Sequence, residues 1–326
     1  IMEGGTASFL EANRQRRKAM PKPLASRWAS ALSLAVVLSA SAQTAQKPKL
    51  PPPDVANVSY GPHERNVLDL WKAKSAKPTP LVIFIHGGGF RAGDKSNLSL
   101  RLLEECLKSG ISVAAINYRF TQHAPFPAPM QDGARAVQYL RMRAAEWNLD
   151  PKRFAATGGS AGACMSLWIG FHDDMADPAS PDPVRRQSTR LAAMGVQGAQ
   201  TTLDPRVIAK LIGEATARHP GLEPFYGLKG DELATQRAYR IFEEASPVNH
   251  LSKDDPPVLL IYSEPDVPLP ADAKPGAGIH HPRFGFYLKE RMDKLGIECT
   301  VRILDTPEKR AEAPRLLAEF FRRHLF

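Results

Sequence analysis

Residues 158–162 read Gly158-Gly159-Ser160-Ala161-Gly162, and they lie between a strand-like stretch at residues 153–157 and an apolar run. A serine on a sharp turn from a strand to a helix sits in strained backbone. Glycines two positions before and after it remove Cβ atoms that would collide there. We therefore take Ser160 as a candidate nucleophile. Alone, the same pattern is also typical of a tight turn that packs a helix against a sheet.

A second motif precedes this turn in the chain. Residues 81–85 form an uninterrupted apolar run suited to a strand buried on both faces, and His86-Gly87-Gly88-Gly89-Phe90 follows directly. Glycines let the backbone approach a substrate closely, so we expect the N–H groups of Gly88, Gly89 and Ala161 to point at a developing negative charge. The order and spacing of the two motifs suit one fold, and together they are much more specific than either motif alone.

The composition is that of a globular protein with one large core. The chain has 326 residues, of which 43% are hydrophobic and 24% charged, and this suits a single α/β domain. The formal net charge is +9, and residues 1–42 hold +4 of it, with six Lys and Arg against two Glu. The remaining excess is spread along the chain, which argues against nucleic-acid binding. Cys106, Cys164 and Cys299 are far apart in apolar surroundings, so we expect buried free thiols.

The N-terminal region has the pattern of a secretory signal. Basic residues precede an apolar run at residues 31–38, and residues 40–42 supply an A-x-A cleavage site. The apolar run is too short to span a bilayer, so we expect a secreted or periplasmic protein without stable membrane insertion after cleavage. Met20 is the expected natural start. The predicted divisions are a signal with a mis-started extension at 1–42, a Pro-rich linker at 43–56 and a folded domain at 57–326.

Strand-like runs alternate with helical patterns along the rest of the chain. The predicted strands are residues 57–60, 66–71, 81–85, 111–117, 153–157, 192–197, 257–262 and 297–304. The predicted helices are residues 98–108, 128–147, 162–171, 205–217, 233–244, 283–295 and 307–324. This alternation predicts an α/β domain with a mostly parallel central sheet of about eight strands, helices on both faces and an edge hairpin made by the first two strands. Residues 173–250 exceed one crossover in length, so we expect a small lid there.

These motifs resemble those of an α/β-hydrolase, and within that fold the secreted lipase-like carbohydrate esterases, which include feruloyl and acetylxylan esterase relatives. The matching segments are residues 86–90 with 93–95, residues 117–119, Phe126-Pro127 with Asp132, and Asp150-Pro151 before the serine turn. The resemblance covers roughly residues 57–326. It implies a serine hydrolase that cleaves carboxylic esters of carbohydrates or short-chain acids, without a cofactor or a metal. Kynurenine formamidases and prolyl-oligopeptidase relatives share parts of the pattern, so an arylformamidase or a peptidase is an alternative.

The nucleophile needs a base and an orienting acid, expected in the chain order Ser, Asp, His. Asp266 follows the buried strand predicted at residues 257–262, where such enzymes place the acid, and we assign it that role. Glu264 is an alternative two residues nearer the strand. The base is the difficulty, because the loop after the last strand, residues 304–310, contains no histidine.

Two histidines could take the place of the absent base. His280 and His281 end a glycine-containing loop just before Pro282, which can open the next helix at its first turn. We take His281 as the base and His280 as its substitute. If neither reaches Ser160, the chain is a catalytically impaired binding protein with a hydrolase fold, because an unassisted serine hydroxyl is a weak nucleophile at neutral pH. The distance from either imidazole to the Ser160 hydroxyl discriminates between the two hypotheses.

Several other polar residues have a structural interpretation. We expect His86 to brace the oxyanion loop, Asp94 and Lys95 to brace it as a pair, and Asp132 to act as an internal hydrogen-bond anchor. Aromatic side chains could line an acyl or sugar pocket, and the candidates are Phe90, Phe120, Phe126, Trp168, Phe225 and Tyr226.

An acidic segment follows the helix predicted after Ser160. His172 is followed by Asp173, Asp174, Asp177 and Asp182, and carboxylate oxygens of this kind suit calcium. The spacing fits no EF-hand loop, so a solvated acidic turn is the preferred interpretation and no metal site is predicted.

Overall fold

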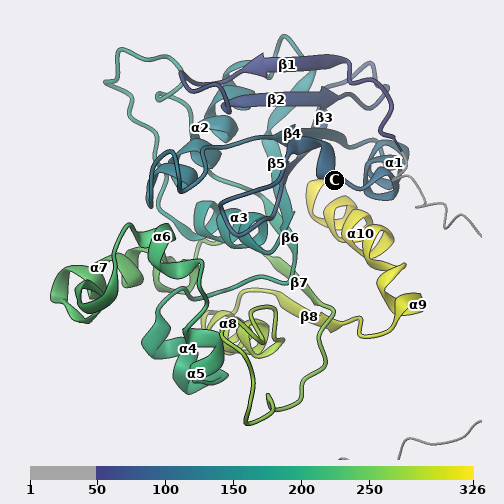
Figure 1. The fold of residues 1–326 in the computed structure, drawn as a ribbon. Helices are drawn as coiled ribbons and strands as arrows, with labels where there is room; N and C mark the ends of the chain where they lie inside the picture. The colour runs from purple at the N-terminus through teal and green to yellow at the C-terminus, as the bar shows by residue number, and fades with distance from the viewer. Residues whose placement is uncertain (1–48) are drawn as a thin grey trace, which may run out of the picture. The chain divides into compact units, whose positions relative to one another are not determined.

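The computed structural model describes residues 49–326, which form one eight-stranded sheet covered by helices on both faces (Figure 1). The strand order is β1-β2-β4-β3-β5-β6-β7-β8. β1 and β2 pair antiparallel at one edge, β2 pairs antiparallel with β4, and the strands from β4 to β8 are parallel. The strands are β1 Val55–Ser59, β2 Val67–Trp71, β3 Thr79–Ile85, β4 Ser112–Ile116, β5 Leu149–Gly159, β6 Ala193–Gln197, β7 Val258–Tyr262 and β8 Cys299–Ile303. The predicted fold class is confirmed.

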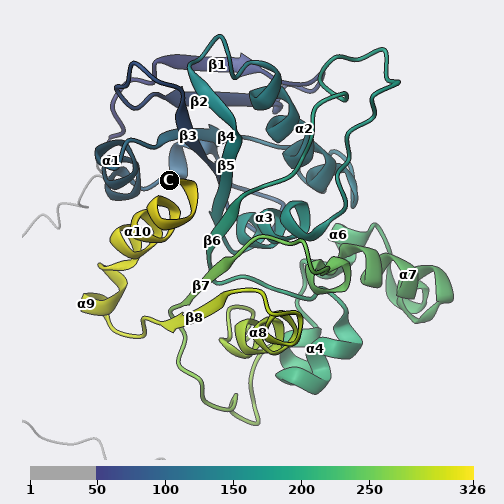
Figure 2. The ribbon, with the colours of Figure 1, turned by 180° about the vertical axis from the view of Figure 1, so that it is seen from behind.

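The helices divide between the two faces of the sheet (Figures 1 and 2). α1 (Leu100–Lys108) and α10 (Ala313–Leu325) pack together on one face, whereas α2 (Ala128–Met142), α3 (Ala161–Phe171) and α8 (Arg283–Leu295) cover the other. β3 shows why the strands between the two layers of helices are apolar at consecutive positions. Leu81, Ile83 and Ile85 are buried in the core beneath α2, α3 and α8, and Val82 is buried on the side of α1 and α10. A strand buried on both faces needs apolar residues at consecutive positions.

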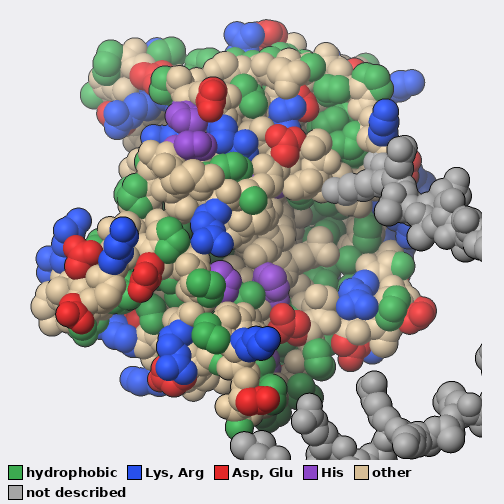
Figure 3. Space-filling view, viewed as in Figure 1, with side chains coloured by type: hydrophobic (Ala, Val, Ile, Leu, Met, Phe, Trp, Pro, Cys, Tyr) green, Lys and Arg blue, Asp and Glu red, His purple; other side chains and the backbone are tan. Residues whose placement is uncertain are grey.

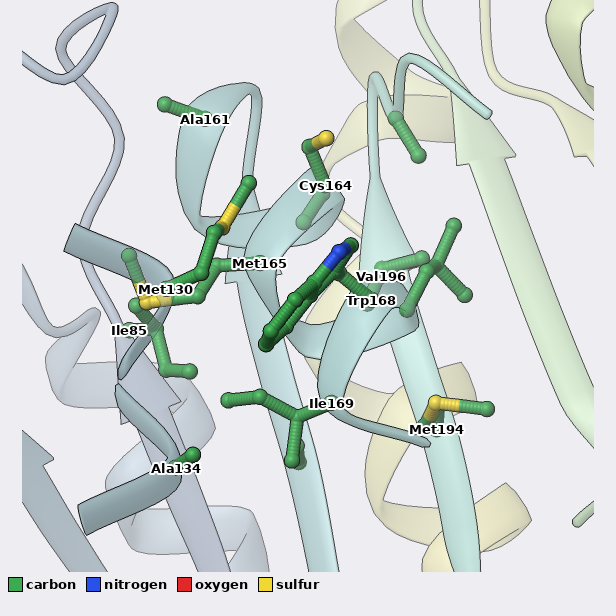
Figure 4. Close-up of a cluster of buried hydrophobic side chains, with 14 of the residues drawn as sticks. Ile85, Met130, Ala134, Ala161, Cys164, Met165, Trp168, Ile169, Met194 and Val196 are labelled. Atoms are coloured by element: carbon green, nitrogen blue, oxygen red, sulfur yellow. The ribbon is translucent and has the colours of Figure 1, made fainter. Parts of the chain in front are cut away.

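The helix that follows Ser160 is buried on every side. All eleven residues of α3 are buried, and Trp168 is only 3% exposed. Figure 4 shows this helix between α2 and β6, with Met165 near Met130 and Met194 and Val196 on its other side. This packing holds the N-terminus of α3, and therefore Ser160, in a fixed place.

Residues 198–257 form a group of short helices after β6, which we call the cap. They are α4 (Pro205–Leu211), α5 (Glu214–Ala217), α6 (Leu222–Tyr226), η2 (Gly230–Ala234), α7 (Gln236–Ala245) and η3 (Pro247–His250). β6 therefore divides the insertion expected at 173–250, and only its second part is helical. The helix expected at 205–217 is interrupted at Gly213, where φ is +145°.

Other boundaries also differ from the sequence-based expectation. α2 ends at Met142 rather than residue 147, and the last helix is preceded by a separate turn, α9 (Pro307–Arg310). The last part of the expected linker belongs to the folded domain. The Trp71 indole donates a hydrogen bond to the Pro51 carbonyl at 2.8 Å, and β1 begins at Val55. The expected signal at 1–42 lies outside the described residues. Within residues 49–326, no helix has both the length and the apolar character needed to cross a membrane.

Candidate active site

Ser160 occupies the sharp turn between β5 and α3. Its backbone has φ +53° and ψ −120°, an uncommon conformation for a residue with a side chain. The flanking glycines are sterically required. A Cβ atom on Gly158 would lie 2.5 Å from the carbonyl oxygen of Ile85, and one on Gly162 would lie 2.0 Å from the same oxygen. The glycines therefore let α3 begin directly against β3, which leaves the half-buried serine at the carboxyl edge of the sheet.

The glycine-rich loop passes beside this turn. A Cβ atom on Gly87 would lie 3.5 Å from that of Ser160, so the two backbones are in contact. Gly88 and Gly89 have φ values of +108° and +60°, which favour glycine. Gly89 and Ala161 both line the cavity that contains Ser160, and Ala161 is the first residue of α3, where helical N–H groups lack intrahelical acceptors. Two of the three expected oxyanion residues therefore border the serine, whereas Gly88 is not among the residues that line the cavity.

His86 lies beneath the loop and is fully buried. Its Nε2 lies 3.3 Å from the Arg65 guanidinium, which can only donate, so Nε2 accepts and Nδ1–H donates to the Gly87 carbonyl at 2.7 Å. Burial lowers the pKa of His86 to about 4, and the nearby Arg65 lowers it further. The ring also stacks on Tyr118 at 4.3 Å. His86 is therefore a neutral brace for the oxyanion loop.

His280 is the histidine that contacts Ser160. Its Nε2 lies 2.8 Å from the Ser160 hydroxyl oxygen. His281 points elsewhere: it is 2% exposed and its Nε2 donates to the carbonyl oxygen of Val267 at 2.9 Å. This corrects the expectation that His281 reaches the serine. Consecutive residues at the entry of α8 project in different directions, so one histidine faces the site and its neighbour is buried against the preceding loop.

The carboxylate beside His280 belongs to Glu264. Its Oε1 lies 3.7 Å from His280 Nδ1, within reach of an ion pair but longer than a hydrogen bond. The expected acid, Asp266, instead pairs with Arg283 at 3.6 Å. The structure therefore brings together Ser160, His280 and Glu264, and it leaves Asp266 and His281 out of this group.

The cap holds the segment that carries His280. The buried Gln200 donates from Nε2 to the carbonyl oxygens of Ile279 at 2.7 Å and Gly198 at 2.9 Å. Thr216 in α5 donates to the Ala277 carbonyl at 2.6 Å, and the Gly276 N–H donates to Ala215 at 2.7 Å. These hydrogen bonds hold the backbone just before His280 against the cap.

A cavity of about 140 Å³ opens at Ser160. Most of its lining is apolar, and it comes from the oxyanion loop, the serine turn, the cap and the end of the histidine loop. The lining residues are Gly89, Phe90, Ser160, Ala161, Gln200, Leu203, His219, Gly221, Leu222, Phe225, Ile279 and His280. Of the six aromatic candidates, only Phe90 and Phe225 line it. On this face of the molecule, histidine side chains show at the surface just above the elements that Figure 1 labels α4 and α8 (Figure 3).

Both histidines of the cavity have lowered pKa values. For His280, burial lowers the pKa below its usual 6.5, and the Glu264 carboxylate opposes this shift. For His219, burial is again the main cause, followed by the positive charges of Arg91 and His280. The His280 imidazole is therefore neutral at pH 7. With a proton on Nδ1 beside Glu264, its Nε2 keeps a lone pair for the serine proton.

Comparison with known proteins identifies the family of this chain. A model of the BD-FAE family matches residues 68–273, which is more than half of the chain. The chain belongs to the BD-FAE family. Esterase LipQ of Mycobacterium tuberculosis is 25% identical over 224 residues, which cover 66% of this chain and 50% of LipQ. The probable carboxylic ester hydrolase LipM of the same organism is 28% identical over 68% of this chain and 50% of its own length. This BD-FAE chain thus spans about half the length of these curated relatives.

Solved structures share the fold of this BD-FAE protein, which is that of an α/β-hydrolase. A truncated carbohydrate esterase from gut microbiota aligns with a TM-score of 0.64 and 20% identity, over 82% of this chain and 95% of that one. An acetyl ester-xyloside bifunctional hydrolase from Caldicellulosiruptor lactoaceticus aligns with the same TM-score and identity, over 83% of this chain and 97% of that one. The resemblance inferred from the sequence is confirmed at the level of fold and family.

Other residues singled out in the BD-FAE sequence have structural contacts. Asp132 accepts from the Arg119 guanidinium, with the shortest contact at 2.6 Å, and from the Arg119 N–H at 2.9 Å. Asp94 and Lys95 do not pair with each other as expected: Asp94 accepts from the Asn117 amide at 2.8 Å, and the Lys95 ammonium pairs with Asp69. The three cysteines are free and buried, as predicted.

The cap residues of the site carry no recognisable motif in the sequence. Gln200, Leu203, His219 and Leu222 lie in a region whose path the periodicity of the sequence does not define. A partial signal was present for Ile279, because it directly precedes the two candidate histidines.

The members of the acidic segment after α3 are dispersed. Asp177 and Asp182 pair with Arg185 and Arg135 respectively, so they do not form a common oxygen cage.

Proposed function

We propose that this protein is a serine hydrolase that cleaves carboxylic esters with a short acyl group, using Ser160, His280 and Glu264. The observation that carries the proposal is the 2.8 Å contact between His280 Nε2 and the Ser160 hydroxyl oxygen. A neutral imidazole at this distance can accept the serine proton, which is the step that an isolated serine lacks. This contact favours an enzyme over an impaired binding protein.

The residues present account for each step of acyl transfer. As Ser160 Oγ attacks the ester carbonyl, His280 Nε2 takes its proton and Glu264 stabilises the imidazolium. In this proposal the N–H groups of Gly88, Gly89 and Ala161 hold the oxyanion. His280 then gives the proton to the leaving alcohol, and an acyl-Ser160 ester remains. A water molecule, deprotonated by the same nitrogen, attacks this ester. The acid is released as Ser160 Oγ takes the proton back from His280 Nε2.

The cavity favours a short acyl chain. A volume of about 140 Å³ is well below the roughly 300–1,000 Å³ of pockets for drug-sized ligands. Its apolar walls, among them Leu203, Leu222 and Phe225, suit a small hydrocarbon chain. Two solved structures of a similar fold are the propionate-bound and butyrate-bound forms of a Thermogutta terrifontis esterase. For the alcohol part of the ester substrate, the carbohydrate esterases among the structural neighbours support a sugar. A sugar ester is therefore a second substrate class to test.

The proposal is tested with purified protein and p-nitrophenyl esters of acetate, butyrate and octanoate. We expect acetate and butyrate to be cleaved faster than octanoate, and Ser160→Ala to remove the activity. A fluorophosphonate probe should label the wild-type serine and leave Ser160→Ala unlabelled. Turnover that survives Ser160→Ala would refute the nucleophile assignment. A wild-type protein that binds esters but is neither labelled nor active would establish the impaired binding protein instead. An acetylated xylan oligosaccharide, an arylformamide and a peptide amide complete the substrate set.

We also propose that residues 1–42 direct secretion or export to the periplasm. The support is the basic stretch, the apolar run at 31–38 and the A-x-A sequence at 40–42. Fusion of residues 20–60 to a reporter that is active only outside the cytoplasm tests this proposal. A reporter that remains cytoplasmic and uncleaved would refute it.

A further inference from the structure

Two histidines and a glutamate meet at the far end of the nucleophile helix. His172 directly follows α3, Glu244 lies in the last turn of α7, and His250 ends η3. Each offers one ligand atom, and these atoms all lie within 4.8 Å of one another. The group joins two parts of the protein, because His172 belongs to the core helix and the other two residues belong to the cap.

The second nitrogen of each histidine faces a backbone carbonyl. His250 Nε2 donates to the carbonyl oxygen of Glu244 at 2.7 Å, so in the neutral ring Nδ1 keeps its lone pair. His172 Nδ1 lies 3.4 Å from the carbonyl oxygen of Asp173, which leaves Nε2 directed at Glu244. A metal-binding histidine characteristically donates its other N–H to a carbonyl or a carboxylate, because this fixes the ring and leaves the lone pair for the metal.

The separation of the His172 and Glu244 ligand atoms also suits a small divalent metal. His172 Nε2 lies 3.3 Å from Glu244 Oε1. Nitrogen and oxygen ligands at about 2.0–2.1 Å from a tetrahedral zinc ion lie about 3.3 Å from each other. The two imidazole rings have centroids 4.5 Å apart and are held against Trp168, whose centroid lies 4.6 Å from that of His172. The ring positions are therefore restrained by packing.

We propose that His172 Nε2, Glu244 Oε1 and His250 Nδ1 bind a divalent transition metal ion of the zinc class, with water in the remaining position. Imidazole and carboxylate ligands suit this class. The metal fastens the ends of α7 and η3 to the end of α3. Since α6 precedes α7 and supplies Leu222 and Phe225 to the acyl cavity, the metal stabilises the part of the cap that closes that cavity. The site is separate from Ser160 and takes no part in the ester chemistry.

A second His-Glu-His group in the protein provides a matched control. His63, Glu64 and His123 are also close enough to share an ion. However, His63 Nδ1 accepts the Arg65 N–H and His123 Nδ1 accepts the Phe120 N–H, both at 3.1 Å. In the neutral rings the proton is therefore on Nε2, and neither histidine has a lone pair free for a metal. We expect this group to bind none.

The proposal is tested by thermal unfolding of the full chain, stripped of metal with EDTA, with and without zinc chloride. Zinc at about 100 times its Kd should raise Tm by about 5 °C, because ligand binding to the native state stabilises it. Magnesium should not, since it prefers oxygen ligands. His172→Gln, His250→Gln and Glu244→Gln should abolish the zinc shift, whereas His123→Gln should retain it in full. Cobalt in place of zinc should give the visible absorption of a tetrahedral site in the wild type and not in His250→Gln.

The outcomes separate a metal site from packing alone. A wild-type Tm that zinc does not raise, or a shift that persists in both His250→Gln and Glu244→Gln, would overturn the proposal. In that case the three side chains serve only to pack the cap against Trp168. Glu244 is exposed, so Glu244→Gln keeps the test valid even if a histidine variant folds poorly.

Discussion

The imidazole of His280 reaches the hydroxyl of Ser160 across 120 residues of chain, with Nε2 and Oγ 2.8 Å apart. The histidine lies in the connection between β7 and α8, and Glu264 lies near the start of the same connection. The loop after β8, where the family resemblance places the base, contains an ion pair between Asp305 and Lys309 instead. One connection thus supplies both partners of the serine, and hydrogen bonds from Gln200 and Thr216 in the cap hold its end in place.

The two adjacent histidines should differ sharply in a kinetic test. His280→Ala removes the group that contacts Ser160, so we expect kcat/KM for p-nitrophenyl acetate to fall by about 10³-fold or more. His281→Ala leaves that contact intact. It removes a buried hydrogen bond to Val267 and should lower the Tm, while the folded protein keeps activity near that of the wild type. The reverse order of the two kinetic effects would assign the base to His281.

Substitutions of the two neighbouring carboxylates, Glu264 and Asp266, should also differ in their effect on activity. Glu264→Gln removes the negative charge beside His280 Nδ1, and we expect a loss in kcat of roughly 10²–10³-fold, smaller than the loss in His280→Ala. The carboxylate is about one-third exposed and 3.7 Å away, which limits its contribution. Asp266→Asn breaks only the exposed pair with Arg283, so its activity should change less than about 3-fold. If Asp266→Asn were the more damaging substitution, Asp266 would be the acid.

The fold was predictable from the sequence because its signal is local. Apolar runs such as residues 81–85 and the two glycine motifs identify the strands and the serine turn without knowledge of distant contacts. The triad partners were not predictable in the same way. His280 and His281 are adjacent, and Glu264 and Asp266 are two residues apart, so no periodicity indicates which member faces Ser160. The choice depends on the path of residues 263–282, which bonds from the cap fix.

The pH profile of kcat/KM should report the lowered pKa of His280. Only the neutral imidazole accepts the serine proton, so activity is present above this pKa and is lost as the pH falls through it. Because burial depresses the pKa, the midpoint of the acid limb should lie below 6.5. Glu264 raises this pKa, so Glu264→Gln should move the midpoint further down. The measurement uses an uncharged ester as substrate. A midpoint above 6.5, or an upward movement in Glu264→Gln, would contradict the assignment.

Gly159 and Gly162, which lie on either side of Ser160, should differ in how well they tolerate an added methyl group. Gly162→Ala places a Cβ atom 2.0 Å from the Ile85 carbonyl oxygen and 2.7 Å from that of His86. Neither backbone can move without separating α3 from β3, so we expect a loss of about 3 kcal/mol in the free energy of unfolding. At Gly159 the nearest atom to a new Cβ is the Gln197 oxygen at 3.9 Å, so Gly159→Ala should be nearly neutral. Urea unfolding of both variants measures the difference, and equal midpoints would show that the α3–β3 contact can relax.

The acyl cavity should set the preferred chain length through its cap wall. Leu222 lines the cavity and is 8% exposed, and Leu222→Ala removes three carbon atoms from that wall. Each further methylene of the acyl chain that becomes buried should contribute about 0.8 kcal/mol, or about 4-fold in kcat/KM. We therefore expect the ratio of hexanoate to acetate cleavage to rise in this variant. Leu228→Ala is the matched control, because Leu228 is a buried cap residue, 2% exposed, that is not among those lining the cavity. It should lower the Tm without changing the ratio. A similar change of ratio in both variants would show that loosening of the cap, rather than cavity shape, decides the acyl preference.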